Sequence, residues 1–432
     1  MEPLEIQAAS PRTKTVASSP AERRLLNVLF ALIGVGYLFP FSALTQPVDY
    51  WTFLFPDFNI EFSITCVFLY TNLIALALIV SFGSTPWFTG RIVGGFAGQL
   101  AVLVFVPAVY EYVSGESAHV WSILGATAFA AIVTAFLDSC VISLASKYPL
   151  HAQESLQFGI GLSTLIGSIY RDVTKVVFPP DAVIASSSLY FYTGAVTVGL
   201  CIGAYYMLRR LPISKFVLST TTSTPPTHES LPLIQPPKKQ QEHKGDYDSS
   251  SQNLTTTKAP IDRWAVLGKC VHNQMQVALL FMTTLTLWPP LVTEMQSHNF
   301  PSLQASGWWP LILLTVFSIS DCIGRLLVSY RCGLTKANVW KPVLLRMLLV
   351  PCIVLSVQGI AFNHDALSVL FVLVLGATNG YHGSLAILFV SECVGDDEKA
   401  IAGSFTGFFL NFGLVLGSSF GLILSRCIHT PQ

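Results

Sequence analysis

The chain of 432 residues alternates between long apolar runs and short polar segments. A run of about 20 apolar residues is long enough to cross the hydrocarbon core of a bilayer as an α-helix. Eleven such runs are present, and each predicts a membrane-spanning helix. They lie near residues 25–45, 61–83, 90–112, 119–144, 154–178, 184–208, 264–292, 306–330, 340–362, 366–391 and 401–426.

Two segments are too polar to belong to the membrane. Residues 1–24 predict a tail, and residues 212–262 are rich in Ser, Thr, Pro, Gln and Lys. The second segment has too little apolar surface to fold, so we expect a disordered loop. It leaves six predicted helices in 25–211 and five in 263–427, followed by a short tail at 428–432. This layout predicts an all-α polytopic membrane protein of two lobes, typical of secondary transporters whose substrate site lies at mid-membrane between the lobes.

The distribution of Lys and Arg predicts the orientation of these helices, because cytosolic loops carry an excess of both residues. With a cytosolic N-terminal tail, the segments that follow the runs 25–45, 90–112, 264–292 and 340–362 lie outside. They contain "TQPVDYWTFLFPDFN", "SGESA", "TEMQSHNFPSL" and "NHD", without any Lys or Arg. We therefore expect the N-terminus and the 212–262 loop in the cytosol, and the C-terminus on the extracellular or lumenal side.

Composition and charge exclude several classes of function. Hydrophobic residues make up 52% of the chain and charged residues 11%, against about 25% charged residues in a globular domain. The formal net charge is zero, so no nucleic acid partner is expected. The nine cysteines lack metal-ligand spacing and are interpreted as buried apolar side chains. Without a phosphate-binding loop or a nucleophile elbow, neither an ATP-driven pump nor an ordinary hydrolase is expected, and no cofactor or metal is implied.

Asp321 and Arg325 are the most conspicuous residues, because they place two charges inside the apolar run 306–330. They are four residues apart and therefore share one face of a helix. Each charge costs about 2.5–3.5 kcal/mol at the centre of a membrane helix, so such residues usually face a substrate or ion path. A structural ion pair is the alternative. A carboxylate beside a guanidinium offers acceptors and fixed donors together, which suits a neutral polyhydroxyl group such as a ribose.

Asp138 is a second acid inside an apolar run, and it has no basic residue near it in sequence. A lone acid in lipid must find a partner in space, bind a cationic substrate or take up a proton. It could also hydrogen-bond the backbone of a neighbouring helix. Phe41, followed by Ser42, and Trp288, which precedes two prolines, are aromatic residues that could stack on a base. Aromatic residues of a membrane-interface belt have the same sequence appearance.

Five motifs in order resemble those of the equilibrative nucleoside transporters, solute carrier family 29, over nearly the whole chain. "FSISDCIGRLL" at 317–327 is similar to a family signature of the form Asp-x-x-Gly-Arg. The other four are "GVGYLFPFSALTQPVDYW", "LLRMLLVP", "NGYHGSL" and "AGSFTGFFLNFGLVLGSSFG". The resemblance implies a fold like the major facilitator superfamily with one helix missing. It also implies transport of nucleosides, and sometimes nucleobases, by alternating access, either facilitative or proton-coupled.

The resemblance also implies roles for individual residues. Asp321 and Arg325 would bind the ribose hydroxyls, and Arg91 would help to close the cytosolic side, where it could pair with Glu398. The remaining substrate-binding positions implied by the family are Phe41, Ser42, Asp138, Cys140, Trp288 and Ser318.

Asp138 is the main departure from the family, which has Gln at this position. We expect this difference to alter base preference or to provide proton coupling. A cationic amine could also pair with Asp138, so an organic cation or monoamine transporter of the same family is the alternative function. A receptor without transport activity is a third class. We expect a multi-pass protein of the plasma membrane, with a vacuolar or lysosomal membrane as the alternative, that works as a monomer.

Overall fold

The computed structural model describes residues 19–56, 60–82, 87–179, 181–219 and 261–429. Within these ranges the chain is helical and forms no β-strand. The tail at 1–18 and most of the predicted loop lie outside the described residues. Residues 212–219, which the sequence placed in that loop, instead form a short helix.

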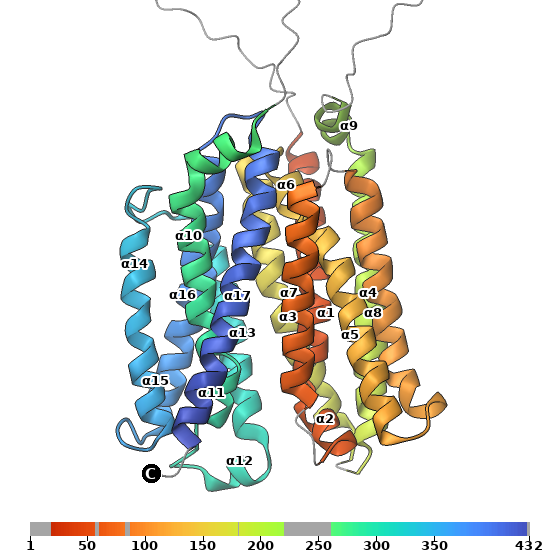
Figure 1. The fold of residues 1–432 in the computed structure, drawn as a ribbon, viewed down its shortest axis with the longest axis vertical. Helices are drawn as coiled ribbons and strands as arrows, with labels where there is room; N and C mark the ends of the chain where they lie inside the picture. The colour runs from red at the N-terminus through yellow and green to blue at the C-terminus, as the bar shows by residue number, and fades with distance from the viewer. Residues whose placement is uncertain (1–18, 57–59, 83–86, 180, 220–260, 430–432) are drawn as a thin grey trace, which may run out of the picture.

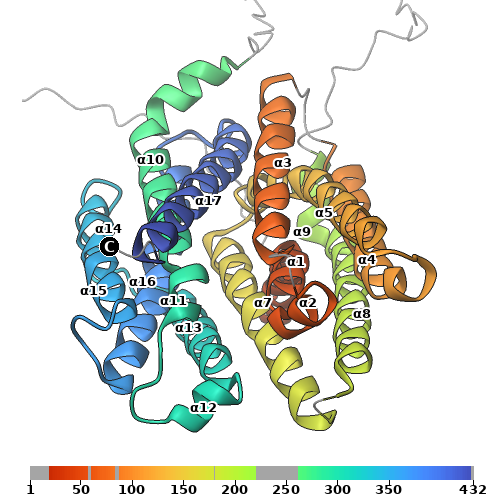
Figure 2. The same ribbon diagram turned by 60° about the horizontal axis from the view of Figure 1, so that its bottom comes forward.

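The helices form two bundles, which we call the N-lobe and the C-lobe (Figures 1 and 2). The N-lobe contains α1 (Pro20–Thr45), α2 (Val48–Leu54), α3 (Ile60–Phe82), α4 (Phe88–Tyr112), α5 (Glu116–Asp138), α6 (Val141–Ala145), α7 (Leu150–Val177), α8 (Val183–Arg210) and α9 (Pro212–Ser219). The C-lobe contains α10 (Arg263–Leu287), α11 (Pro290–Glu294), α12 (Pro301–Ala305), α13 (Trp308–Leu326), η1 (Leu327–Ser329), α14 (Trp340–Leu345), η2 (Arg346–Leu348), α15 (Leu349–Val357), α16 (Asp365–Ser391) and α17 (Lys399–His429).

All eleven predicted membrane runs coincide with helices, although several are interrupted. Among the described residues, ten helices are long and apolar enough to cross a membrane. The remaining predicted run, 154–178, forms α7, whose buried face is rich in Gln, Ser, Thr and Gly and which is therefore more polar than its neighbours. The predicted helix 119–144 is divided into α5 and α6 at residues 139–140, directly after Asp138.

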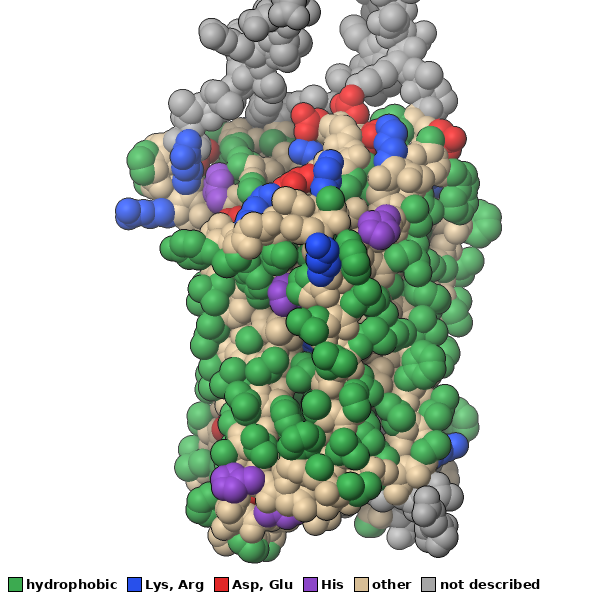
Figure 3. Space-filling model, turned by 90° about the vertical axis from the view of Figure 1, so that its left-hand side faces the viewer, with side chains coloured by type: hydrophobic (Ala, Val, Ile, Leu, Met, Phe, Trp, Pro, Cys, Tyr) green, Lys and Arg blue, Asp and Glu red, His purple; other side chains and the backbone are tan. Residues whose placement is uncertain are grey.

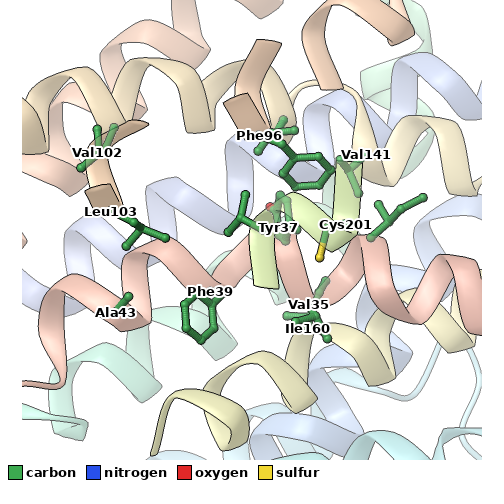
Figure 4. Packing of buried hydrophobic residues seen from close by; sticks show 14 of the residues in the cluster. Val35, Tyr37, Phe39, Ala43, Phe96, Val102, Leu103, Val141, Ile160 and Cys201 are labelled. Atoms are coloured by element: carbon green, nitrogen blue, oxygen red, sulfur yellow. The ribbon is translucent and has the colours of Figure 1, made fainter. Parts of the chain in front are cut away.

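The N-lobe is built around α1, because α4, α7 and α8 all pack against it. Figure 4 shows Tyr37 and Phe39 of α1 among apolar side chains from these neighbours, including Phe96 and Cys201. All four are buried, with at most 5% of their surface exposed. In a membrane, close van der Waals packing of such side chains contributes to holding helices together. These contacts fix α1 within the N-lobe.

The two ends of the molecule differ in charge. We call the end that carries α9 and the first turns of α1 and α10 the loop face, and the end that carries α2, α12 and the last turn of α17 the opposite face (Figure 1). On the side shown in Figure 3, apolar side chains cover the middle of the molecule, and most Lys and Arg side chains gather near the loop face. An apolar band below a charged end is the arrangement expected of a protein that spans a bilayer.

Close helix crossings depend on glycine at particular places. In the C-lobe, α13 crosses α16 at Gly380, where a Cβ atom would lie 2.0 Å from the backbone oxygen of Asp321. No side chain fits at that distance without moving one helix away from the other. Gly380 therefore fixes the position of Asp321 relative to α16.

The Gly380→Ala variant should destabilise the protein, because the added methyl group forces α13 and α16 apart; overpacking of this kind costs about 1–3 kcal/mol. The measurement is the thermal unfolding midpoint of the detergent-purified protein. Gly203→Ala is the matched control, since no atom lies within 4 Å of a Cβ at this position of α8. The interpretation of the crossing is wrong if the two variants unfold at the same temperature.

Candidate functional site

A cavity of about 100 Å³ lies between the lobes. The N-lobe contributes α1, α3, α5 and α7 to its wall, and the C-lobe contributes α10, α13, α16 and α17. Six of the residues predicted from sequence as substrate-binding line this central cavity. They are Phe41, Ser42, Asp138, Trp288, Asp321 and Arg325.

Asp321 and Arg325 form a buried ion pair on α13, with 2.8 Å between Oδ2 of the acid and Nε of the guanidinium. Only 2% of Asp321 and 5% of Arg325 is exposed, so neither charge is stabilised by bulk water. The spacing of four residues places both on one helix face, as the sequence predicted. Such a pair is retained in a low-dielectric interior only when further hydrogen bonds satisfy its remaining atoms.

Amide and hydroxyl groups supply those hydrogen bonds. Nδ2 of Asn379 donates to Oδ1 of Asp321 over 2.6 Å, and Oγ1 of Thr284 in turn donates to Oδ1 of Asn379 over 2.7 Å. Nη1 of Arg325 donates to Oε1 of Gln157 over 3.1 Å and to Oγ of Ser384 over 3.5 Å. Asn379, Thr284 and Ser384 belong to the C-lobe, whereas Gln157 belongs to α7 of the N-lobe. The ion pair is thus held in a fixed orientation and is connected to both lobes.

Asp138 is the last residue of α5 and faces the same cavity from the N-lobe. Its Oδ2 accepts hydrogen bonds from Nδ2 of Asn72 and from Nδ2 of Asn411, each over 2.9 Å. The hydroxyl of Tyr37 also hydrogen-bonds the Asp138 carboxyl group. All three partners are neutral, and the exposed fraction of Asp138 is 3%. Among the described residues, this acid therefore has hydrogen-bond donors but no cationic side chain in direct contact.

Aromatic rings line the cavity from both lobes. The ring of Phe41 lies 4.8 Å from that of Phe68. Trp288 stacks on Phe317 with 4.7 Å between ring centres and an angle of 17° between planes. The indole Nε1–H of Trp288 is buried and has no hydrogen-bond partner among the described residues. Flat apolar surfaces beside unpaired donors are suited to a heteroaromatic ligand.

Two of the predicted substrate-binding residues lie outside the cavity wall. Sγ of Cys140 donates to the backbone oxygen of Phe136 over 3.0 Å, and Cys140 is completely buried. Oγ of Ser318 donates to the oxygen of Leu314 and lies 3.1 Å from Oγ of Ser168 on α7. Ser318 lies on α13, whereas Cys140 lies in the break between α5 and α6. Both side chains are engaged by neighbouring groups away from the lining.

The expected pair between Arg91 and Glu398 is not formed. Nη1 of Arg91 instead donates to Oγ of Ser139 over 3.4 Å. Glu398 accepts from Nζ of Lys269 over 2.5 Å, and this hydrogen bond lowers the pKa of the Glu398 carboxyl group. Glu398 lies directly before the first residue of α17, and its cationic partner, Lys269, comes from α10.

A second and larger cavity, of about 820 Å³, lies on the side of the opposite face. Its walls include Asp49 of α2 and Lys175 of α7, and it shares Leu285 and Trp288 with the central cavity. Its volume is in the usual range for ligand sites, about 300–1,000 Å³. We call it the vestibule. Because the two cavities share wall residues, the vestibule adjoins the central cavity on the side of the opposite face.

The loop face is closed by contacts between the lobes. There α6 and the start of α7 meet the end of α16 and the start of α17, and the seam between them leaves a space of only about 10 Å³. Oγ of Ser391 lies 3.4 Å from Oε1 of Gln153, and Oγ of Ser404 donates to the oxygen of Ser139 over 2.9 Å. The larger cavity thus lies towards the opposite face, whereas contacts between the lobes close the loop face.

Sequence reasoning missed the neutral polar residues that orient the charges. Asn72, Gln157, Asn379 and Asn411 all line the central cavity, as does Tyr37. Each of the four amides stands within or beside a predicted membrane run, where an amide group is also costly to bury without a partner. That cost is the signal that could have identified them.

Comparison with known proteins agrees with this geometry. A family model described as "Nucleoside transporter" matches residues 124–425. Equilibrative nucleotide transporter 8 of Arabidopsis thaliana is 24% identical over 405 residues, which cover 92% of this chain and 94% of the relative. Equilibrative nucleoside transporter 4 of Homo sapiens is 22% identical, with 94% of this chain and 84% of the relative covered.

Solved structures show the same fold. The proton:xylose symporter XylE of E. coli, a major facilitator superfamily protein, superposes with a TM-score of 0.61 at 10% sequence identity. The superposition covers 95% of this chain and 90% of the symporter. The two-lobed fold predicted from the sequence is confirmed. Since the family model matches more than half of the chain, the protein belongs to the equilibrative nucleoside transporter family and is a membrane transporter, not an enzyme.

Proposed function

We propose that this protein carries nucleosides across a membrane by alternating access, with the ribose bound at Asp321 and Arg325. The observation that carries the proposal is the buried ion pair of α13 in a cavity between two lobes. A vicinal diol donates to a carboxylate and accepts from a guanidinium, so the ribose 2′- and 3′-hydroxyls match the two members of the pair. The names of the relatives support a nucleoside as the substrate.

The base then lies among the aromatic rings, in the direction of Asp138. Trp288 and Phe41 offer flat surfaces on which a purine or pyrimidine stacks, and the unpaired indole N–H of Trp288 offers a donor. A carboxylate at 138 accepts hydrogen bonds from exocyclic amines and repels carbonyl oxygens. An ionised Asp138 therefore favours bases that present donors to it, whereas a protonated Asp138 both donates and accepts.

Asp138 also provides a site for proton coupling. Its direct partners are the neutral Asn72 of α3, Tyr37 of α1 and Asn411 of α17, and Arg325 of α13 lines the same cavity without bonding to it. A buried carboxylate with no cation in contact gains from binding a proton when substrate displaces water. We propose that one proton accompanies each nucleoside. An organic cation that pairs with Asp138 is the alternative, which the comparisons do not favour.

The distribution of Lys and Arg indicates how the protein is oriented in the membrane. Lys and Arg concentrate at the loop face on the side seen in Figure 3, which supports a cytosolic N-terminus by the positive-inside rule. The vestibule then opens to the extracellular side or to the lumen of a vacuole or lysosome. We propose the plasma membrane as the location and a monomer as the working unit, since both halves of the cavity come from one chain.

Uptake into proteoliposomes tests the ribose assignment. Wild type should take up adenosine and uridine, and should take up 2′,3′-dideoxyuridine about ten- to 100-fold less efficiently, because hydrogen bonds to charged groups contribute about 1.5–3 kcal/mol. Asp321→Asn should lose most uptake of uridine, and what uptake is left should not distinguish the two substrates.

The Asp365→Asn variant is the control, since this acid of α16 binds Ser297 and nearby backbone N–H groups away from both cavities. It should retain the preference for ribose. Equal uptake of uridine and its dideoxy analogue by wild type would contradict the assignment, whatever the variants do.

Accumulation under a proton gradient tests the role of Asp138. One proton per nucleoside supplies about 1.36 kcal/mol for each pH unit, so a gradient of one unit, acid outside, should give up to about tenfold accumulation. Asp138→Asn should only equilibrate the substrate across the membrane. Glu294→Gln, which removes an acid from the vestibule wall and not from the central cavity, should still accumulate it. Wild type that merely equilibrates the substrate shows instead that transport is facilitative.

A further inference from the structure

Arg325 and Asp138 line the central cavity from different lobes, and each binds an amide side chain of the other lobe. Arg325 of the C-lobe donates to Oε1 of Gln157 in the N-lobe over 3.1 Å. Asp138 of the N-lobe accepts from Nδ2 of Asn411 in the C-lobe over 2.9 Å. Gln157 is 2% exposed and Asn411 is 3% exposed. The arrangement is reciprocal, with one charge and one amide contributed by each lobe.

Both hydrogen bonds lie on the side of the cavity that is closed. Gln157 lines the central cavity and also the narrow seam at the loop face. One turn before Asn411, Gly407 packs so closely that a Cβ would lie 2.5 Å from the backbone oxygen of Asp138. Because α5 and α17 touch there, the lobes cannot separate at the loop face without breaking the bond between Asn411 and Asp138.

We propose that Gln157 and Asn411 are latch residues that hold the loop face closed while the opposite face is open. Each bond joins a neutral amide to a charged group, the stronger class of hydrogen bond in a protein interior. A ligand that hydrogen-bonds Arg325 or Asp138 competes with the amide for the same charged atoms. The latches thereby link occupation of the cavity to release of the loop face. This inference rests on transport through the cavity, but it does not depend on which solute is carried.

The chain contains a matched control for the Asn411 latch. Asn72 and Asn411 both donate through Nδ2 to the same oxygen of Asp138, and both distances are 2.9 Å. Asn72 is on α3, in the same lobe as Asp138, whereas Asn411 is on α17 in the other lobe. Removing either amide costs the carboxylate one equal hydrogen bond, but only the loss of Asn411 removes a connection between lobes.

The Gln157 latch also has a control within the chain. Nη1 of Arg325 donates to Oε1 of Gln157 over 3.1 Å, to the backbone oxygen of Gln157 over 3.4 Å and to Oγ of Ser384 over 3.5 Å. Of the two contacts with Gln157, Gln157→Ala removes the shorter one. Ser384 is on α16, in the same lobe as Arg325. Replacing Ser384 thus removes a partner of the guanidinium without removing a connection between the lobes.

Hydrogen–deuterium exchange of the full-length protein in nanodiscs, without substrate, tests the proposal. Asn411→Ala should accelerate exchange in segments 138–148 and 388–404, which form the loop-face seam, by roughly tenfold, the equivalent of one hydrogen bond to a charged group. Asn72→Ala should leave exchange in these segments as in wild type. Gln157→Ala should accelerate it, and Ser384→Ala should not.

The comparison within each pair decides the outcome. Equal acceleration by Asn411→Ala and Asn72→Ala would show that the asparagines merely stabilise the carboxylate, and an absence of acceleration in both Asn411→Ala and Gln157→Ala would show that neither is a latch. Either result overturns the proposal. The unfolding midpoints of the four variants show whether faster exchange reflects global unfolding. If Asn411→Ala does not fold, the comparison of Gln157→Ala with Ser384→Ala decides the test. Exchange is measured without substrate, whereas nucleoside transport is measured by uptake. Failure of the latch proposal can therefore be distinguished from failure of the proposed function.

Discussion

The cost of burying charge inside a bilayer determines how the centre of this protein is built. Asp321 and Arg325 satisfy each other over 2.8 Å, but a pair alone leaves carboxylate and guanidinium atoms without partners. Asn379 and Gln157 bind those atoms. Each ionised side chain at the centre of a membrane helix costs about 2.5–3.5 kcal/mol on insertion scales. The fold must therefore keep the polar groups around the pair, and the helices that carry them, in fixed positions.

The same requirement ties the site to the movement of the lobes. A charge that needs several partners takes them from whichever helices surround it, and at the interface some of these belong to the other lobe. Asp138 binds Asn411 in this way, close to the glycine contact that brings α17 against α5. A substrate bound between the lobes replaces some of these partners. Binding and conformational change are then two consequences of one set of hydrogen bonds.

Sequence reasoning located the charges and the order of the helices, because a charge in an apolar run and the length of such a run are both visible in one dimension. It did not predict the break after Asp138, since residues 119–144 form one continuous apolar run. It also placed Cys140 in the cavity and paired Arg91 with Glu398, whereas these side chains have other partners. Such contacts depend on the rotation of each helix and, for Glu398, on a partner 129 residues away in the chain, which periodicity does not record.

A structure of the protein with bound uridine tests the central claim most directly. The account predicts the ribose hydroxyls within hydrogen-bond distance of Asp321 and Arg325, the base against Trp288 or Phe41, and the base edge facing Asp138. A nucleoside bound in the reverse orientation, with its base at the α13 ion pair, would contradict the account. So would a nucleoside that occupies only the vestibule and leaves the partners of Asp321 and Arg325 unchanged.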